Sequence, residues 1–420
     1  MAAAARALDT IMETSPVDAD QNLLNQEQEF DIKAGSDEGK LVYNFSPGPC
    51  ILPHAVLEKC AEEMLDYRGS GQSVMELSHR KPEFTRIVDM TKSELRRFLD
   101  VPDTHTIMLN QGGATMQYTA VVKNLLGLKP ARKAMYVTTG LWSTQCMKEA
   151  RKYIPAENLI EVTNLSGSNY TQMTDPRTWK IDPEASFIHI CVNETVHGFE
   201  ITEENFPWEL IPKGVAVVGD MSSNIGTVNI NWDRFDVVYA GAQKNIGPTG
   251  ATVIIVNKKL LGKADADVPV LCDWQTFEQS PGTFYNTPPC WCIYVTGLNV
   301  SYMNQRGGIP TYDREAEIKS RMLYDVLDKS EGYYVNRTDK KYRSRINVNF
   351  RIEGDRSLEK KLIAEAEEHK IINIAGHMTN PGIRISMYNA MPIEGVVSLC
   401  HFLAKFQKEN AIGKPILSKL

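Results

Sequence analysis

The sequence predicts an α/β fold in which a large domain with a mainly parallel β-sheet is followed by a smaller α+β domain. Between about residues 55 and 304, short apolar runs rich in β-branched residues alternate with helical patterns, which is typical of a parallel sheet. After about residue 305 the pattern changes to strands that alternate between apolar and polar positions. A chain of 420 residues is long enough to bury a core in each of two such domains.

Residues 1–40 differ from the rest of the chain in their charge. They hold nine acidic and three basic residues, a balance of −6, which equals the formal net charge of the whole chain. The segment lacks the apolar region of a secretion signal and is too acidic for a usual transit peptide. We therefore expect an acidic, flexible extension on a cytoplasmic protein.

The composition argues against several classes of protein. A net charge of −6 does not supply the basic field that a general nucleic-acid surface needs. No stretch is long and apolar enough to span a membrane. The eight cysteines form no Cys-x-x-Cys pair, so they indicate neither a zinc site nor a disulfide framework. We expect no metal, no nucleic acid and no membrane among the partners.

The large domain is predicted to contain six buried strands. They are short apolar runs at residues 106–111, 134–139, 186–192, 215–220, 235–241 and 251–257. Helical patterns lie between some of them, for example over residues 143–153, where Ser143 is a candidate N-cap.

The region from 305 to 420 is predicted to form the smaller α+β domain. Residues 345–352 and 382–389 read as strands. Residues 357–370 read as a helix with one apolar face, made of Leu358, Leu362, Ile363 and Ala366. A last amphipathic helix is marked by Val396, Leu399, Cys400 and Leu403. Residues 41–54 are expected to pack with this domain.

Two charged residues stand at the ends of buried strands. Asp220 ends the run 215–220, and Lys244 follows the run 235–241 just before an Asn-Ile-Gly-Pro break. Ligands of open α/β sheets bind outside the carboxyl ends of the strands. Taken singly, the lysine can turn to solvent and the aspartate can cap a helix, because a charged group inside an apolar core needs a partner.

Two further features favour a functional interpretation over these structural ones when they are combined with Asp220 and Lys244. The run 110–115, Asn-Gln-Gly-Gly-Ala-Thr, can turn backbone N–H groups toward an anion, although it is neither a dinucleotide fingerprint nor a P-loop. Trp142 offers a flat ring that is either ordinary packing or a plate for an aromatic ligand. A lysine, an acid, an anion nest and a flat side chain together suit pyridoxal phosphate.

Several longer motifs make a family resemblance visible. In chain order they are "NFSPGPCILP" (44–53), "LDYRGSGQSVMELSHR" (65–80), "GLWS" (140–143), "VNETVHG" (192–198), "GDMSSN" (219–224), "AGAQKNIG" (240–247), "FYNTPP" (284–289) and "GIRISMYNAMPIE" (382–394). Over roughly residues 41–408 the chain resembles the phosphoserine aminotransferases, which are fold-type I, class-V pyridoxal-phosphate enzymes. The resemblance implies the fold-type I architecture, with a large cofactor-binding domain over 55–304 and a small domain over 305–420.

The resemblance also implies roles in binding the cofactor. Lys244 would bond to the cofactor aldehyde and move the substrate proton, and Asp220 would keep the ring nitrogen protonated. Trp142 would stack on the ring, and Thr195 would hydrogen-bond near its hydroxyl. The phosphate would be held by Ala114, Thr115 and Gln243, together with Asn286 and Thr287 of a neighbouring subunit. That last pair implies a homodimer with shared active sites.

The implied substrate site combines several cations. Arg384 would pair with the α-carboxylate, a bidentate task suited to guanidinium. Ser46, His79 and Arg80 would line the pocket, the last two meeting the substrate phosphate across the subunit interface. The implied reaction transfers an amino group from glutamate to 3-phosphohydroxypyruvate, giving 2-oxoglutarate and phosphoserine for serine biosynthesis. 4-Phosphohydroxythreonine is a further implied substrate where vitamin B6 is made.

One position departs from the family pattern. The family has Gly-His-Arg before the Gly-x-Arg strand, whereas this chain has Gly376-His377-Met378. His377 remains as a donor, and Lys81 is a candidate replacement for the missing cation. The departure leaves open another fold-type I aminotransferase with a different distal pocket. A second alternative, from a different class, is a non-catalytic binding protein on the same fold.

Overall fold

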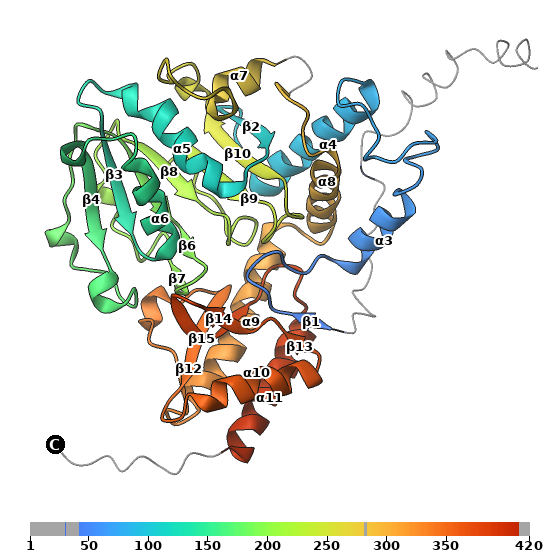
Figure 1. The fold of residues 1–420 in the computed structure, drawn as a ribbon, viewed down its shortest axis with the longest axis vertical. Helices are drawn as coiled ribbons and strands as arrows, with labels where there is room; N and C mark the ends of the chain where they lie inside the picture. The colour runs from blue at the N-terminus through green and yellow to red at the C-terminus, as the bar shows by residue number, and fades with distance from the viewer. Residues whose placement is uncertain (1–29, 31–41, 281–283, 411–420) are drawn as a thin grey trace, which may run out of the picture.

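A computed structural model of the chain describes residue 30 and residues 42–280 and 284–410. It has the predicted α/β fold, with a large sheet between helices and a smaller sheet below it (Figure 1). The predicted extension over residues 1–40 lies outside the described residues apart from Phe30. Within the described part of the chain, no helix combines the length and apolarity needed to cross a membrane.

The large sheet has seven strands in the order β2-β10-β9-β8-β5-β3-β4. Its neighbours pair in parallel except β10, which runs antiparallel to both β9 and β2. All six predicted strands are confirmed, each within two residues of its expected bounds. The strands are β2 (His105–Asn110), β3 (Lys133–Thr138), β4 (Leu159–Asn164), β5 (Ala185–Cys191), β8 (Ala216–Asp220), β9 (Val237–Gly241) and β10 (Thr252–Asn257).

Strand β4 was not predicted. It lies at the edge of the sheet and is only partly buried, because Glu161 and Asn164 interrupt its apolar pattern. The signal used for the interior strands, a continuous apolar run, is therefore absent from it.

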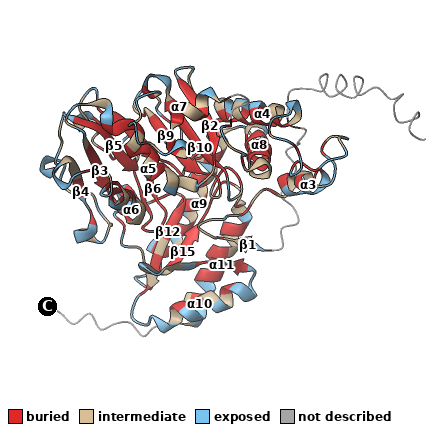
Figure 2. Cartoon of the chain, turned by 45° about the horizontal axis from the view of Figure 1, so that its top comes forward, coloured by how far each residue is buried: buried red, intermediate tan, exposed pale blue. Residues whose placement is uncertain are grey.

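Helices cover both faces of the large sheet. Residues that alternate along one strand point to opposite faces, and in β9 Val238 and Ala240 join one core whereas Val237 and Tyr239 join the other. Apart from β4, the strands of this sheet are accordingly buried along most of their length (Figure 2). The helices are α3 (His54–Glu62), α4 (Pro82–Leu99) and α8 (Cys290–Gln305) on the first core, and α5 (Gly113–Leu125), α6 (Leu141–Ala150) and α7 (Trp274–Gln279) on the second.

The predicted N-cap of α6 is wrong. The helix begins at Leu141 with Gly140 as its N-cap, and Ser143 is the third residue of the helix. The Ser143 hydroxyl accepts hydrogen bonds from the backbone N–H groups of Thr139 at 2.9 Å and Gly140 at 3.0 Å. A Cβ at position 140 would lie 2.4 Å from Glu194 Cδ, so the buried Glu194 side chain requires glycine there.

The smaller sheet is antiparallel, in the order β11-β12-β15-β14. The two predicted strands appear as β12 and β15, and the edge strands β11 and β14 were not predicted. Both predicted helices are present, with Leu362 and Ala366 of the first and all four marked residues of the second buried. The elements are α9 (Ile309–Asp328), β11 (Tyr334–Val335), β12 (Asn347–Ile352), α10 (Ser357–Glu368), β13 (Ile371–Ile372), β14 (Ala375–His377), β15 (Asn380–Ser386) and α11 (Ile393–Glu409).

Two short pairings complete the fold. Strand β1 (Tyr43–Asn44) pairs in parallel with β13, and β6 (Asn193–Glu194) pairs with β7 (Phe199–Glu200). The domain boundaries at residues 54/55 and 304/305 stay predictions. The second falls one residue before α8 ends at Gln305.

Candidate active site

The predicted cofactor residues of one chain converge on a single cavity. It lies where β5, β8 and β9 end and where α5 and α6 begin. Half of the predicted site residues line it, namely Ala114, Thr115, Trp142, Thr195, Asp220, Gln243 and Lys244. Segments far apart in the sequence therefore meet at the carboxyl edge of the sheet, as expected for this architecture.

Lys244 points into the cavity rather than to solvent. It lies in the turn after β9, its Nζ donates a hydrogen bond to Thr195 Oγ1 at 2.7 Å, and Nζ lies 5.6 Å from the centre of the Trp142 ring. Burial lowers the pKa of the Lys244 amine, and Arg384 lowers it further, against the opposing carboxylates of Asp220 and Glu194. A lowered pKa favours the neutral amine, which is the nucleophilic form.

Asp220 is a buried carboxylate, 5 % exposed, at the last position of β8. Its Oδ1 accepts hydrogen bonds from the Ser222 backbone N–H at 3.0 Å and the Ser222 hydroxyl at 2.6 Å. Among the described residues, Oδ2 has no hydrogen-bond partner. The carboxylate is thus fixed by one oxygen and can accept an N–H from a ligand with the other.

The start of α5 forms the predicted anion nest. Gly112 and Gly113 have positive φ angles of 95° and 65°, a conformation that favours glycine. The helix begins at Gly113, so Ala114 and Thr115 lie in its first turn. Backbone N–H groups in the first turn have no partner within the helix and attract anions such as phosphate.

Glu194 is a functional residue that the sequence analysis missed. Its carboxylate accepts hydrogen bonds from the backbone N–H groups of Trp142 at 3.0 Å and Ser143 at 2.9 Å, and from the Ser143 hydroxyl at 2.6 Å. These bonds fix the first turn of α6 and with it the Trp142 ring. The quoted motif "VNETVHG" contains Glu194, but only the folded structure shows that it caps a helix more than 50 residues away in the sequence.

His197 supports the same helix as a structural residue. Its Nδ1 accepts a hydrogen bond from the Leu141 N–H at 3.2 Å, and its ring packs on Tyr170. Burial lowers the pKa of His197 to about 4, so the ring is neutral at physiological pH. The geometry therefore gives His197 a structural role.

Arg384 is an arginine without a counter-ion. It lies on β15 with 7 % of its surface exposed, and its Nε is buried with no hydrogen-bond partner. Burial lowers the pKa of its guanidinium. No described residue forms an ion pair with it. Because an unpaired buried charge is costly, the site is built for an anionic ligand beside Lys244.

Ser46 lies in a loop that passes Lys244. The Cys50 N–H donates to the Gln243 carbonyl at 3.0 Å, and a Cβ on Gly48, which has a φ of 133°, would lie 3.2 Å from Lys244 Cγ. The Ser46 hydroxyl accepts a hydrogen bond from the Gly48 N–H at 3.4 Å. The structure thus brings the loop that carries Ser46 against Lys244.

The remaining predicted residues do not line this cavity. His79 and Arg80 lie between α3 and α4, Asn286 and Thr287 precede α8, and His377 ends β14 with its Nδ1 2.8 Å from Thr379 Oγ1. The first four are the residues expected to reach a second copy of the chain. The cavity also contains residues that were not predicted as site residues: Gly113, Tyr118, Cys191, Asn193, Ser222 and Ser223.

The arrangement fits pyridoxal phosphate. The cavity offers an amine for the aldehyde, a carboxylate with one unpartnered oxygen for the ring nitrogen, a ring face from Trp142 and a helix N-terminus for the phosphate.

Comparison with known proteins agrees with this geometry. The family model "Aminotransferase class-V" matches residues 42–399. A curated phosphoserine aminotransferase of Herminiimonas arsenicoxydans is 42% identical over 371 residues, which are 88% of this chain and 99% of that protein. The solved phosphoserine aminotransferase of Bacillus circulans subsp. alkalophilus is 31% identical with a TM-score of 0.82, over 89% of this chain and 100% of its own.

A further solved structure is described as a phosphoserine aminotransferase with bound pyridoxal phosphate, from Trichomonas vaginalis. It is 30% identical with a TM-score of 0.79 and covers 86% of this chain and 99% of its own. With a family match over most of the sequence and a relative of 42% identity, this chain belongs to the class-V aminotransferases.

Proposed function

We propose that this chain is a pyridoxal-phosphate-dependent phosphoserine aminotransferase that acts in serine biosynthesis in the cytoplasm. It would transfer an amino group reversibly between glutamate and 3-phosphohydroxypyruvate, giving 2-oxoglutarate and phosphoserine. The observation that carries the proposal is the buried, unpaired Arg384 beside a lysine of lowered pKa. The names of the relatives support the substrate class.

The proposed cofactor contacts follow from the cavity. Trp142 would cover one face of the ring, Asp220 would accept the ring N–H, and the Ala114–Thr115 backbone with Gln243 would hold the phosphate. When bound, pyridoxal phosphate supplies an electrophilic carbon and a ring that accepts the electron pair of the substrate Cα–H bond. Thr195 holds the Lys244 amine in place through its hydroxyl.

In the proposed mechanism, Lys244 carries the proton. As a neutral amine, its Nζ would take the proton from the substrate Cα and later return it to the carbon on the other side of the transferred nitrogen. Burial favours the neutral form, and the Asp220 carboxylate stabilises the positive charge that Lys244 acquires on taking the proton. Arg384 orients the α-carboxylate so that the Cα–H bond faces the lysine.

The substrate phosphate would be bound by a second subunit. His79 and Arg80 do not reach the cavity of their own chain, so in this proposal they complete the site of a partner in a homodimer, as Asn286 and Thr287 would for the cofactor. Large exposed apolar side chains flank both segments: Leu65 and Met75 near the first, and Tyr285 beside the second. Exposed apolar residues beside cationic ones are typical of an interface.

An absorbance titration tests the proposal. Adding phosphoserine to the purified holoenzyme should convert the cofactor to its amino form, and adding 2-oxoglutarate should reverse the change. In Lys244→Ala, both spectral changes should be much slower than in the wild type. Arg384→Lys should need on the order of tenfold more phosphoserine for the same change, because lysine cannot pair with the carboxylate through two hydrogen bonds. A spectrum that responds to glutamate but not to phosphoserine would instead indicate an aminotransferase with another distal pocket.

A further inference from the structure

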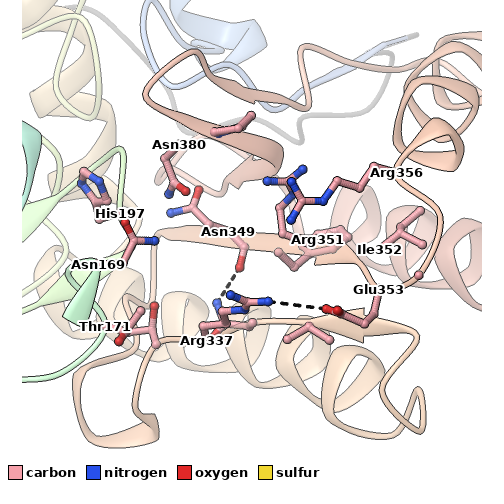
Figure 3. Close-up of a pocket in the computed structure, with 16 residues that line it drawn as sticks. Asn169, Thr171, His197, Arg337, Asn349, Arg351, Ile352, Glu353, Arg356 and Asn380 are labelled. Carbon is pink, nitrogen blue, oxygen red and sulfur yellow. Dashed lines mark hydrogen bonds and ion pairs between the residues drawn. The ribbon is translucent and has the colours of Figure 1, made fainter. Parts of the chain in front are cut away.

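A second polar cavity lies between the two sheets, away from the cofactor pocket. It has a volume of about 250 Å³ and is lined by β11, β12 and β15 of the smaller sheet, and by Asn169, Thr171 and His197 from the large domain (Figure 3). None of the predicted site residues lines it. Its size fits a small metabolite.

The cavity carries an excess of positive charge. Three guanidinium groups line it, from Arg337, Arg351 and Arg356, against a single lining carboxylate, Glu353. Arg337 pairs with Glu353 at 3.6 Å. Arg351 pairs with Glu359, which lies behind the wall, at 2.7 and 3.0 Å. Arg356 has no ion-pair or hydrogen-bond partner for its side chain among the described residues.

Arg351 is held in place before any ligand binds. The bidentate pair with Glu359 fixes its guanidinium, and its stem lies against Gly382, where a Cβ would approach Arg351 Cδ to 2.3 Å. Gly382 has a φ of 122°, which favours glycine at that position. Figure 3 shows the side chains of Arg351 and Arg356 extending along the same wall. Two neighbouring cations with one counter-ion attract an anion.

We propose that this cavity is a second anion-binding site, separate from the cofactor pocket, for a small oxyanion. The class includes hydrogen phosphate and phosphate monoesters. Arg356 and Arg351 would bind the oxyanion.

Such a ligand would bridge the two domains close to the catalytic lysine. The side chains of Asn349 and Asn380 both donate to the Val196 carbonyl, at 2.9 and 2.8 Å. Val196 directly follows Thr195, whose hydroxyl binds Lys244 Nζ. An occupant would therefore contact the wall that supports the active site without touching the reacting atoms.

Calorimetry of inorganic phosphate binding to the holoenzyme tests the proposal. Arg356→Ala should weaken one class of phosphate site by about fivefold to tenfold, and Arg351→Gln/Arg356→Ala should remove that class. The matched control is Lys360→Ala, an exposed cation on the same helix that does not line the cavity. Arg80→Ala distinguishes this cavity from the proposed substrate-phosphate site. It should weaken phosphate binding at the substrate site and leave binding at the second cavity unchanged.

Two results would overturn the proposal. The first is unchanged phosphate binding in the double variant, and the second is an equal loss in Lys360→Ala, which would mean general surface charge.

Discussion

Arg384, Lys244 and Asp220 show how far single residues could be interpreted before the fold was known. Lys244 and Asp220 could be recognised from their positions at strand ends, because a charged group beside a buried apolar strand is costly unless it has a partner. Arg384 came only from the family motif, since its lack of a counter-ion is a property of the folded chain. Glu194 was missed for the same reason: its partners, Trp142 and Ser143, are distant in the sequence.

Met378 gives the first prediction at the scale of residues. Its side chain is 88% exposed directly after β14, at the position where the pattern of the resembled family has an arginine. Met378→Arg should tighten phosphoserine binding by about threefold to tenfold, less than a desolvated charge pair because the position is exposed. Isothermal titration measures it, with Met378→Gln as the uncharged control. Unchanged or weaker binding would mean that the distal site is already complete.

His189 gives a prediction about pH. It is fully buried in β5, and burial lowers its pKa from 6.5 to about 4. As the pH is lowered, His189 of the unfolded chain is protonated near pH 6.5, whereas His189 of the folded chain is protonated only near pH 4. The free energy of unfolding therefore falls as the pH decreases from 6.5 to about 4. His189→Gln should reduce this loss by about 3 kcal/mol, since each pKa unit corresponds to ~1.36 kcal/mol.

Urea unfolding at several pH values measures the effect of His189→Gln. His401 is exposed on α11 and shows no comparable burial, so His401→Gln is the control and should keep the wild-type pH dependence. An identical pH profile for His189→Gln and the wild type would show that this histidine does not contribute to acid sensitivity.

At the scale of elements, fully buried strands were predictable and partly exposed ones were not. Continuous apolar runs identified six strands of the large sheet, including the edge strand β2, because both faces of each are buried. Strands β4, β11 and β14 lie at sheet edges, where partial exposure removes that pattern. The start of α6 was misplaced because its cap is made by Glu194, a tertiary contact that local sequence does not encode.

The contact between Phe30 and α8 gives a prediction at this scale. Phe30 is 4% exposed, lies before the family match, and has its ring 6.2 Å from that of Tyr294. Gly297, in the middle of α8, provides the space: a Cβ there would lie 2.2 Å from Phe30 Cζ and 2.4 Å from Thr91 Oγ1. Glycine normally costs a helix about 1 kcal/mol relative to alanine, so its presence indicates a packing requirement.

Phe30→Ala should lower the free energy of unfolding by about 3 kcal/mol, as for other buried phenylalanines. Gly297→Ala should also destabilise the chain despite its better helix propensity, and the penalty should be smaller when Phe30→Ala is already present. Urea unfolding of both single variants and the double variant measures this coupling. Additive penalties would mean that Phe30 and Gly297 do not share a contact.

At the scale of the whole molecule, the active site depends on the junction of two domains and, in the proposed function, of two subunits. The sequence motifs indicated that His79, Arg80, Asn286 and Thr287 belong to the site. Their positions outside the cavity of their own chain follow from the fold, and no sequence spacing could have shown them. The junction within one chain is visible directly, because β15 of the small domain carries Arg384 to the lysine of the large domain.

Asn389 is the residue that joins these domains beside Lys244. It is 4% exposed and follows β15. Its side chain accepts a hydrogen bond from the Thr227 hydroxyl at 2.9 Å and donates one to the Gly226 carbonyl at 2.8 Å. Its backbone N–H donates to the side chain of Asn245, the neighbour of Lys244, at 2.9 Å. Asn389 therefore connects the small domain to the turn that carries the catalytic amine.

Asn389→Ala should lower the free energy of unfolding by about 2–4 kcal/mol, because the Gly226 carbonyl and the Thr227 hydroxyl hydrogen lose their buried partner. It should also lower kcat, because Thr227, which accepts a hydrogen bond from the Asn245 side chain beside Lys244 at 2.7 Å, is no longer held in place. Urea unfolding and steady-state kinetics measure the two effects, with Asn410→Ala at the end of α11 as the control. Loss of stability at an unchanged kcat would mean that Asn389 holds the domains together without positioning the lysine.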